Sequence, residues 1–160
     1  GIILASPPLD FAVSASYFVV AHFHYVLFGT VVFAMFAGFY FWWPKMTGRM
    51  LNERLGKIHF WTLFVGFHLT FLIQHWLGIV GMPRRYADYP VQFADFNAIA
   101  SVGSLGFGLM QIYFLLFVVL PTYRGGQKAA DKPWDGANGL EWTIPSPAPF
   151  HTFETPPTVK

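Results

Sequence analysis

The sequence predicts an all-α membrane protein with three transmembrane helices and an irregular, proline-rich carboxy-terminal tail. Only 11 % of the 160 residues are charged, whereas soluble domains contain about 25 %. Residues 11–44, 58–83 and 96–123 contain no Asp, Glu, Lys or Arg, and together these windows hold more than half of the chain. Uncharged apolar runs longer than ~18 residues are typical of transmembrane helices. After residue 123 the composition changes, and half of the twelve prolines lie there.

The same composition excludes several classes of protein. A soluble enzyme is excluded, and a net charge of +2 provides no basic patch for nucleic acid. Without cysteine, the chain cannot form disulfides, thiolate metal sites or iron–sulfur clusters. Three helices make a thin bundle with apolar faces all round, so we expect the chain to be part of a larger protein. No signal peptide is expected, because no basic segment and cleavage site follow Gly1.

We expect a membrane region at residues 1–123 with spans at about 17–43, 58–80 and 96–123. Ser6, Pro7 and Pro8 are expected to stop any helix just before Asp10. The first span is expected to end at aromatic residues followed by Pro44, which cannot continue a helix.

The second span is closed by Gly81 and Pro83, and the third contains Gly103, Gly106 and Gly108. Small residues allow neighbouring helices to approach closely, so we expect this face of the third span to pack on protein. Residues 124–160 are predicted to be an extended tail that lies against a partner, with a disordered end as the alternative.

Basic residues predict the orientation of the chain. They are concentrated in the loop between the first two spans and at the start of the tail: Lys45, Arg49, Arg54, Lys57, Arg124, Lys128 and Lys132. By the positive-inside rule, both segments lie in the cytoplasm. The amino terminus and the 81–95 loop are therefore expected outside.

The strongest local signal is the segment AHFHY, near the outer end of the first span. On a helix, positions i and i+2 lie about 200° apart, so His22 and His24 point to opposite sides and cannot share one metal ion. Each could bind a separate metal centre, and imidazole is a common axial ligand of haem iron. The alternative is two histidines that are hydrogen-bonded inside a helix bundle. Intramembrane ionisable residues favour the functional interpretation.

A second signal is the pair Arg84-Arg85, just past the outer end of the second span. Two arginines there could hold the carboxylates of a cofactor bound by the histidines. The residues alone favour lipid headgroups, or pairing with Asp88 and Asp95, over this role. His68 and His75 lie seven residues apart on one face, and we interpret both as packed, hydrogen-bonded residues.

Five segments together carry a resemblance to a known family: VVAHFHYVLFG, WWPKMTG, KIHFWTLFVGF, QHWLG and GMPRRYADYP. They closely resemble subunit I of the haem–copper respiratory oxidases, of the cytochrome c oxidase type. The resemblance covers essentially the whole chain. Such subunits form a twelve-helix bundle, so the resemblance implies the last three helices plus a bacterial-style tail. The expected location is a bacterial inner membrane, with the amino terminus outside and the carboxy terminus in the cytoplasm.

The resemblance also implies roles for individual residues. His22 is similar to the proximal ligand of the high-spin haem at the oxygen site, and His24 to one of the two axial ligands of the low-spin haem. Arg84 and Arg85 match a pair that binds haem propionates, which replaces the lipid interpretation, and Asp10 matches an acidic residue near the high-spin haem's propionate. Two haems are expected, of type A with B or O as alternatives. Copper is also expected, with its ligands outside this chain.

The implied activity is the reduction of oxygen to water with electrons from cytochrome c, coupled to proton pumping. The isolated chain is expected to be inactive, because the copper ligands and half of the low-spin haem ligation lie in earlier helices. Expected partners are the rest of subunit I, oxidase subunits II and III, cytochrome c and the lipid bilayer. The alternatives are a quinol oxidase subunit I, or a non-catalytic haem-binding paralogue or fragment. Histidines in the preceding sequence would distinguish an enzyme from the latter.

One position departs from the family pattern. Where many members have His-Asp about eight residues before the first haem histidine, this chain has Ser14-Ala15. That pair helps to bind magnesium, so the departure puts a magnesium site in question.

Overall fold

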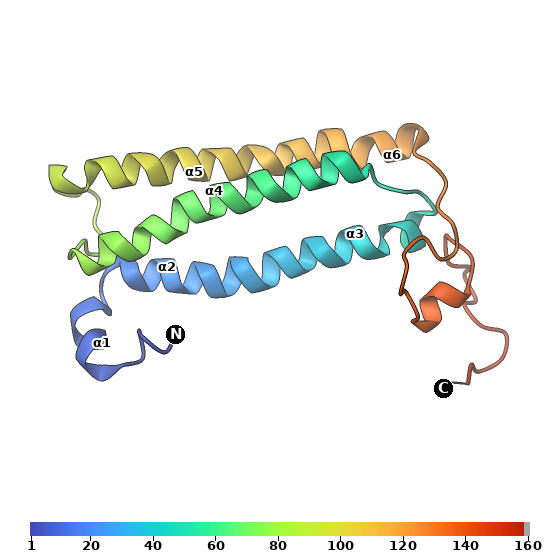
Figure 1. Ribbon diagram of the computed structural model, residues 1–160, viewed down its shortest axis with the longest axis horizontal. Coiled ribbons are helices and arrows are strands. Elements are labelled where there is room, and N and C mark those ends of the chain that lie inside the picture. The colour runs from blue at the N-terminus through green and yellow to red at the C-terminus, as the bar shows by residue number, and fades with distance from the viewer. Residues whose placement is uncertain (159–160) are drawn as a thin grey trace. The chain divides into compact units, whose positions relative to one another are not determined.

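The computed structural model describes residues 1–158, and in this range it contains helices and turns without any strand. The elements in chain order are α1 (Pro7–Val13), α2 (Tyr17–Val26), the π-helical turn η1 (Leu27–Val32), α3 (Phe33–Thr47), α4 (Glu53–Ile79), the 3₁₀ turn η2 (Val91–Phe93), α5 (Ala94–Tyr113), the π-helical turn η3 (Phe114–Val119), α6 (Leu120–Gly125) and the 3₁₀ turn η4 (Leu140–Thr143) (Figure 1).

Three of the described helical stretches are long and apolar enough to cross a membrane: Tyr17–Thr47, Glu53–Ile79 and Val91–Gly125. The first joins α2, η1 and α3 into one helix, and the last joins η2, α5, η3 and α6. The predicted all-α class with three candidate spans is therefore confirmed. The division into a membrane region and a cytoplasmic tail stays a prediction.

Two local predictions about proline were wrong. The segment Ser6–Pro8 starts a helix instead of stopping one, since Ser6 occupies the N-cap position of α1 and prolines fill its first turn. Proline suits this position because its fixed φ is helical and the amide that it lacks would have no partner there.

The first span also continues through Pro44 to Thr47. The last turn keeps hydrogen bonds despite the missing proline donor, because the Thr47 hydroxyl donates to the Trp43 carbonyl at 2.9 Å and the Gly48 amide to the Pro44 carbonyl at 2.8 Å. Gly48 then ends the helix at a φ of 70°, in the left-handed region that suits a glycine after a helix.

The described chain forms two compact units. The first, residues 1–34 and 57–112, contains α2, most of α4 and nearly all of α5. Gly78 of α4 lies so close to α2 that a Cβ atom there would clash with the backbone nitrogen of Phe18. Between α4 and α5, which lie side by side in Figure 1, a Cβ on Gly103 would come within 2.8 Å of the Thr70 amide nitrogen.

The glycines of α5 differ in their surroundings. Gly103 packs on α4 as the small-residue pattern predicted, whereas Gly106 and Gly108 have open space at the Cβ position within the described residues. A small apolar core closes the end of this unit that carries the 81–93 loop; its members are Leu77, Met82 and Phe93, with Tyr17 and Ile73 packed against them.

The second unit comprises residues 35–56 and 113–160, of which 159–160 are not described. Phe36, Phe39 and Tyr40 of α3 pack their rings on Phe114, with centroids 5.1–5.7 Å apart. The tail lies against the carboxy-terminal end of α3. An isolated antiparallel bridge joins Arg49 to Lys128, and the Met50 amide donates to the Gln127 carbonyl at 2.8 Å. The described part of the tail thus contacts the end of α3, and the prediction that it lies against a partner stays a prediction.

Candidate functional site

Helix α2 carries both predicted ligand histidines in its second turn. Its start is fixed by Ser16, whose side-chain oxygen accepts a hydrogen bond from the Phe18 amide at 3.2 Å and donates one to the Val13 carbonyl at 2.7 Å. Serine in this position satisfies an amide that has no partner within the helix. His22 and His24 are both half-buried.

The His24 ring is held in one orientation. Its Nδ1 lies 2.7 Å from the Val20 carbonyl oxygen. Since a carbonyl can only accept, Nδ1 is the donor in this bond, and in the neutral ring Nε2 then has the lone pair. The ring stacks on Phe71 of α4 at 4.2 Å and on the neighbouring Phe23 at 4.4 Å. A neutral imidazole with a fixed Nδ1–H and an available Nε2 is the arrangement that suits a metal-ligating histidine.

His22 lies in different surroundings. A Cβ atom on Gly1 would lie 3.5 Å from His22 Cε1, so the amino-terminal residue lies beside this ring. The helical spacing directs the two histidines to opposite sides of α2. In residues 1–158, no three His, Cys, Asp or Glu side chains gather in a way that could hold a metal ion. Because they face opposite sides of α2, the two histidines suit two separate ligands and do not suit one chelate.

The loop that carries the two arginines is attached to the start of α2. The Tyr17 amide donates to the Met82 carbonyl and the Arg84 amide to the Ala15 carbonyl, both at 3.0 Å. A bridge between Ser16 and Pro83 lies between these bonds. The backbone thus brings Arg84 to the amino-terminal end of α2, the helix that carries both histidines. The sequence predicted only that the arginines and the histidines lie near the outer ends of their spans.

The two guanidinium groups differ in exposure, since Arg84 is half-buried and Arg85 is exposed. Arg85 has a φ of 69°, a left-handed conformation that is uncommon outside glycine and is frequent at functional sites. Within the described residues neither Asp88 nor Asp95 pairs with either arginine; Asp88 instead accepts a hydrogen bond from the Tyr89 amide at 2.8 Å. Both guanidinium groups remain available for an anionic partner.

Asp10 lies exposed on α1, and its partner is Ser14. The Ser14 hydroxyl lies 3.0 Å from Asp10 Oδ1 and 2.5 Å from the Asp10 carbonyl oxygen. Ala15 offers no ligand atom, and Ser14 is already committed to Asp10. Magnesium prefers oxygen-rich sites with carboxylates, so the Ser14–Ala15 edge does not suit this ion.

One buried polar atom in the same unit was missed by the sequence analysis. The Tyr25 hydroxyl is buried and has no hydrogen-bond partner within residues 1–158. Its ring meets the His75 ring between α2 and α4, with centroids 5.2 Å apart. His68 behaves as predicted, because its Nδ1 donates to the Phe64 carbonyl at 2.9 Å. The sequence signal for the Tyr25 hydroxyl was an intramembrane tyrosine directly after His22 and His24.

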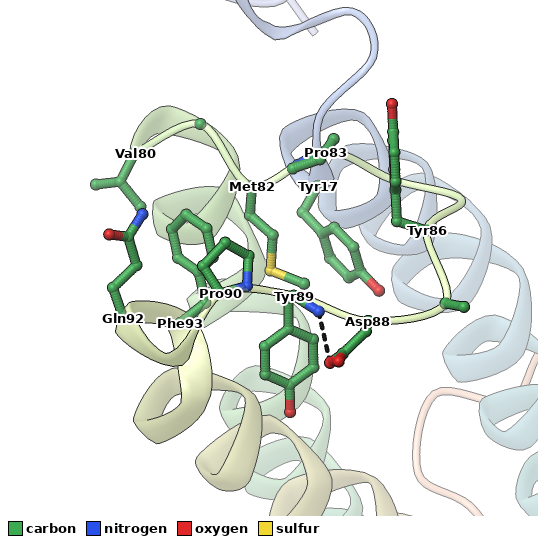
Figure 2. A pocket seen from close by; sticks show the side chains of 12 residues that line it. Tyr17, Val80, Met82, Pro83, Tyr86, Asp88, Tyr89, Pro90, Gln92 and Phe93 are labelled. Carbon is green, nitrogen blue, oxygen red and sulfur yellow. Dashed lines mark hydrogen bonds between the residues drawn. The ribbon is translucent and has the colours of Figure 1, made fainter.

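A pocket of about 450 Å³ lies beside the arginine loop (Figure 2). Tyr17 of α2 lines it together with Met82, Asp88 and Tyr89 of the loop, and Phe93 also lines it. None of the predicted site residues lines this pocket. Its position therefore adds no ligand to the histidine and arginine site.

Comparison with known proteins identifies the family. The sequence model described as cytochrome c and quinol oxidase polypeptide I matches residues 1–106. The cytochrome c oxidase subunit 1-beta assigned in Streptomyces avermitilis is 61 % identical over 163 aligned residues, which cover 100 % of this chain and 29 % of the relative. The cytochrome c oxidase subunit 1 of Corynebacterium diphtheriae is 58 % identical, with 100 % of this chain and 29 % of the relative covered.

The chain thus spans less than a third of the length of the curated relatives that it matches. The match to the family covers α1, α2, α3, α4 and the arginine loop, together with part of α5. It includes every residue of the candidate site. This chain belongs to the family of cytochrome c and quinol oxidase polypeptide I.

Proposed function

We propose that this chain is the carboxy-terminal part of the catalytic subunit of a bacterial respiratory terminal oxidase. In the whole subunit it would supply axial histidines to two haems for the reduction of oxygen to water, with electrons from cytochrome c and coupled proton pumping. The observation that carries the proposal is the geometry of His24, with Nδ1 bonded to a carbonyl and Nε2 left as a ligand atom. When bound, haem iron supplies electron transfer and oxygen binding.

The two histidines have separate roles in this proposal. His24 is assigned to the low-spin haem, where a ring clamped between Phe23 and Phe71 keeps its ligand atom in one direction. His22 is assigned to the high-spin haem on the opposite side of α2.

Arg84, Arg85 and Asp10 are assigned to the haem propionates. Guanidinium groups bind carboxylates through paired, charge-assisted hydrogen bonds, and the absence of an internal carboxylate partner within residues 1–158 leaves both arginines free for this. The bond from the Arg84 amide to the Ala15 carbonyl holds this loop at the start of the histidine helix.

The remaining parts of the oxidase are outside this chain. The proposal places the copper ligands and the second low-spin ligand in the preceding part of subunit I, and subunits II and III and cytochrome c as partners. The chain alone would then be inactive. The proposed location is the cytoplasmic membrane, with the 81–95 loop outside and the tail in the cytoplasm.

The test replaces single histidines in the full-length subunit, purified as the oxidase complex. His24→Asn should remove the low-spin haem spectrum, and His22→Asn should perturb the high-spin, ligand-binding spectrum. His68→Asn is the matched control, since His68 has the same bond from Nδ1 to a carbonyl four residues earlier but has no assigned iron. Loss of both haem signals in either single variant, at normal protein level, would contradict the two-site assignment.

A quinol oxidase is the second candidate, because the family description includes both electron donors. The names of the aligned relatives favour cytochrome c. Turnover of the purified complex with reduced cytochrome c and with a quinol, each as the only donor, distinguishes the two.

A further inference from the structure

Lys45, in the last turn of α3, is buried, and its hydrogen-bond partners in the described residues are backbone carbonyls. The Glu141 carboxylate interacts with it electrostatically. Lys45 is 5 % exposed, whereas lysine is almost never fully buried unless it is paired. Its Nζ donates to the backbone carbonyls of Ile144 at 2.6 Å, Asp131 at 3.0 Å and Pro145 at 3.3 Å. An ammonium group has three donors, so every one of them is used.

All three acceptors belong to the tail. They lie 86 to 100 residues further along the chain than Lys45. The indole ring of Trp142, which is itself 5 % exposed, covers the ammonium with its centroid 5.2 Å from Nζ. An aromatic face attracts a desolvated cation. The tail thus forms a receptor for one positive charge, made of carbonyl oxygens and an aromatic ring.

The tail also donates hydrogen bonds to backbone carbonyls at the end of α3. The last carbonyls of a helix have no intrahelical partner. Here the Ala148 amide donates to the Lys45 carbonyl at 3.1 Å, and the Ala129 amide donates to the Gly48 carbonyl at 2.9 Å. One turn earlier, the Trp134 indole donates to the Phe41 carbonyl at 2.9 Å. These bonds come from both ends and the middle of the segment 127–148.

The segment has little regular structure of its own to keep it in place. Within residues 127–148 the described elements are one 3₁₀ turn and one isolated bridge, and its buried apolar side chains are Ala137, Trp142 and Ile144. Without the ammonium, the Ile144 carbonyl, whose bond to Lys45 is buried, would lose its donor, and an unpaired buried carbonyl is costly. Asp131 and Pro145 are exposed residues, and the bonds to their carbonyls are partly buried.

We propose that residues 127–148 form a strap that closes over the carboxy-terminal end of α3, and that the buried ammonium of Lys45 keeps this strap closed. The strap has a closed state, held by one cation, and an open state in which its carbonyls are hydrated. Lys45 is a positioning residue for the strap and has no part in the histidine site. This inference does not depend on the haem assignments.

The test uses Lys45→Met in the full-length subunit within the purified oxidase, studied by hydrogen–deuterium exchange and mass spectrometry. Peptides from residues 127–148 should exchange about tenfold faster or more, the factor that corresponds to one lost hydrogen bond to a charged group. The haem spectrum should stay unchanged. The matched control is Lys132→Met, which removes an exposed tail lysine bonded to Asn138 Oδ1 at 2.9 Å. This control should exchange like the wild type.

Two outcomes would overturn the strap proposal. One is exchange in Lys45→Met that equals that of the wild type. The other is wild-type exchange in Trp142→Leu, the variant that changes the receptor from the tail side and is used if Lys45→Met does not accumulate. Faster exchange across residues 127–148 in Trp142→Leu supports the proposal, and wild-type exchange in that variant contradicts it.

Discussion

In the unit formed by residues 35–56 and 113–158, the buried Lys45 ammonium has three carbonyl partners, whereas in the unit formed by residues 1–34 and 57–112 the buried Tyr25 hydroxyl has no partner within the described residues. In the unit formed by residues 1–34 and 57–112, the Arg84 and Arg85 side chains also have no anionic partner within the described residues. Buried polar groups in folded proteins are normally paired. The unit that contains the tail also holds two buried atoms without a hydrogen-bond partner in the described residues, Trp43 Nε1 and Ser146 Oγ. The difference therefore lies in the charged groups, since the Lys45 ammonium is bonded within residues 1–158 and the two guanidinium groups have no carboxylate there.

The packing of the two units differs in a parallel way. Helices α2 and α4 approach so closely that only glycine fits at position 78. In the other unit, polar bonds between an irregular segment and a helix end replace such close helix contacts. The α2–α4 interface has no room for an added atom at position 78, whereas the interface between the tail and the end of α3 depends on individual hydrogen-bond donors.

Gly78→Ala should be the most damaging change. The added methyl group would collide with backbone atoms of Phe18, which cannot rotate away as a side chain can. Overpacking of this kind costs about 3 kcal/mol, and we expect a lower midpoint of thermal haem loss in the purified complex. Gly108→Ala is the control, since it has open space at Cβ and gains about 0.5 kcal/mol from helix propensity. Equal midpoints for both variants would contradict the close α2–α4 contact.

Tyr25→Phe and Trp134→Phe should differ in sign. Trp134→Phe removes the bond to the Phe41 carbonyl and should lower the free energy of unfolding by about 1 kcal/mol. Tyr25→Phe removes a buried hydroxyl that has no partner within residues 1–158, so stability should stay the same or rise. Thermal unfolding of both variants in the oxidase complex measures this. A large loss in Tyr25→Phe would show that another part of the oxidase bonds this hydroxyl.

The smallest effect concerns pH and Glu141. The pKa of this carboxyl is lowered from its ordinary value of 4.5, first by its own backbone N–H and then by the Trp42 indole, which donates to Oε1 at 3.2 Å. Because the pKa of Glu141 is lower in the folded chain, its ionised carboxylate stabilises the docked tail at pH values above the unfolded pKa. This stabilisation is lost as the pH falls through the folded pKa. Trp fluorescence titrated below pH 4.5 should show a small acid transition. Glu141→Gln should lack this transition, and its persistence there would rule out this carboxyl as the source.

Much of the site could be predicted from residues close together in the sequence. The spacing of His22 and His24 places them on opposite sides of any helix, whatever lies around it. The uncharged windows predicted the three long helices for the same reason, since helix periodicity and apolar length are local properties. The two errors at proline were also local. Ser6–Pro8 and Pro44 were interpreted as breaks, although proline suits the first turn of α1 and the last turn of α3 keeps bonds from Thr47 and Gly48.

The sequence by itself therefore determined the helical class, the opposed histidines and, through the family resemblance, the proposed haem roles. Tertiary structure alone decided three features: the attachment of the arginine loop at Ala15, the packing of the Tyr25 ring on His75 and the burial of Lys45. The sequence analysis counted Lys45 as a basic loop residue that marks the cytoplasmic side. Its partners lie 86 to 100 residues away and are backbone carbonyls. Every residue type carries such a carbonyl, so no sequence pattern could reveal this pairing.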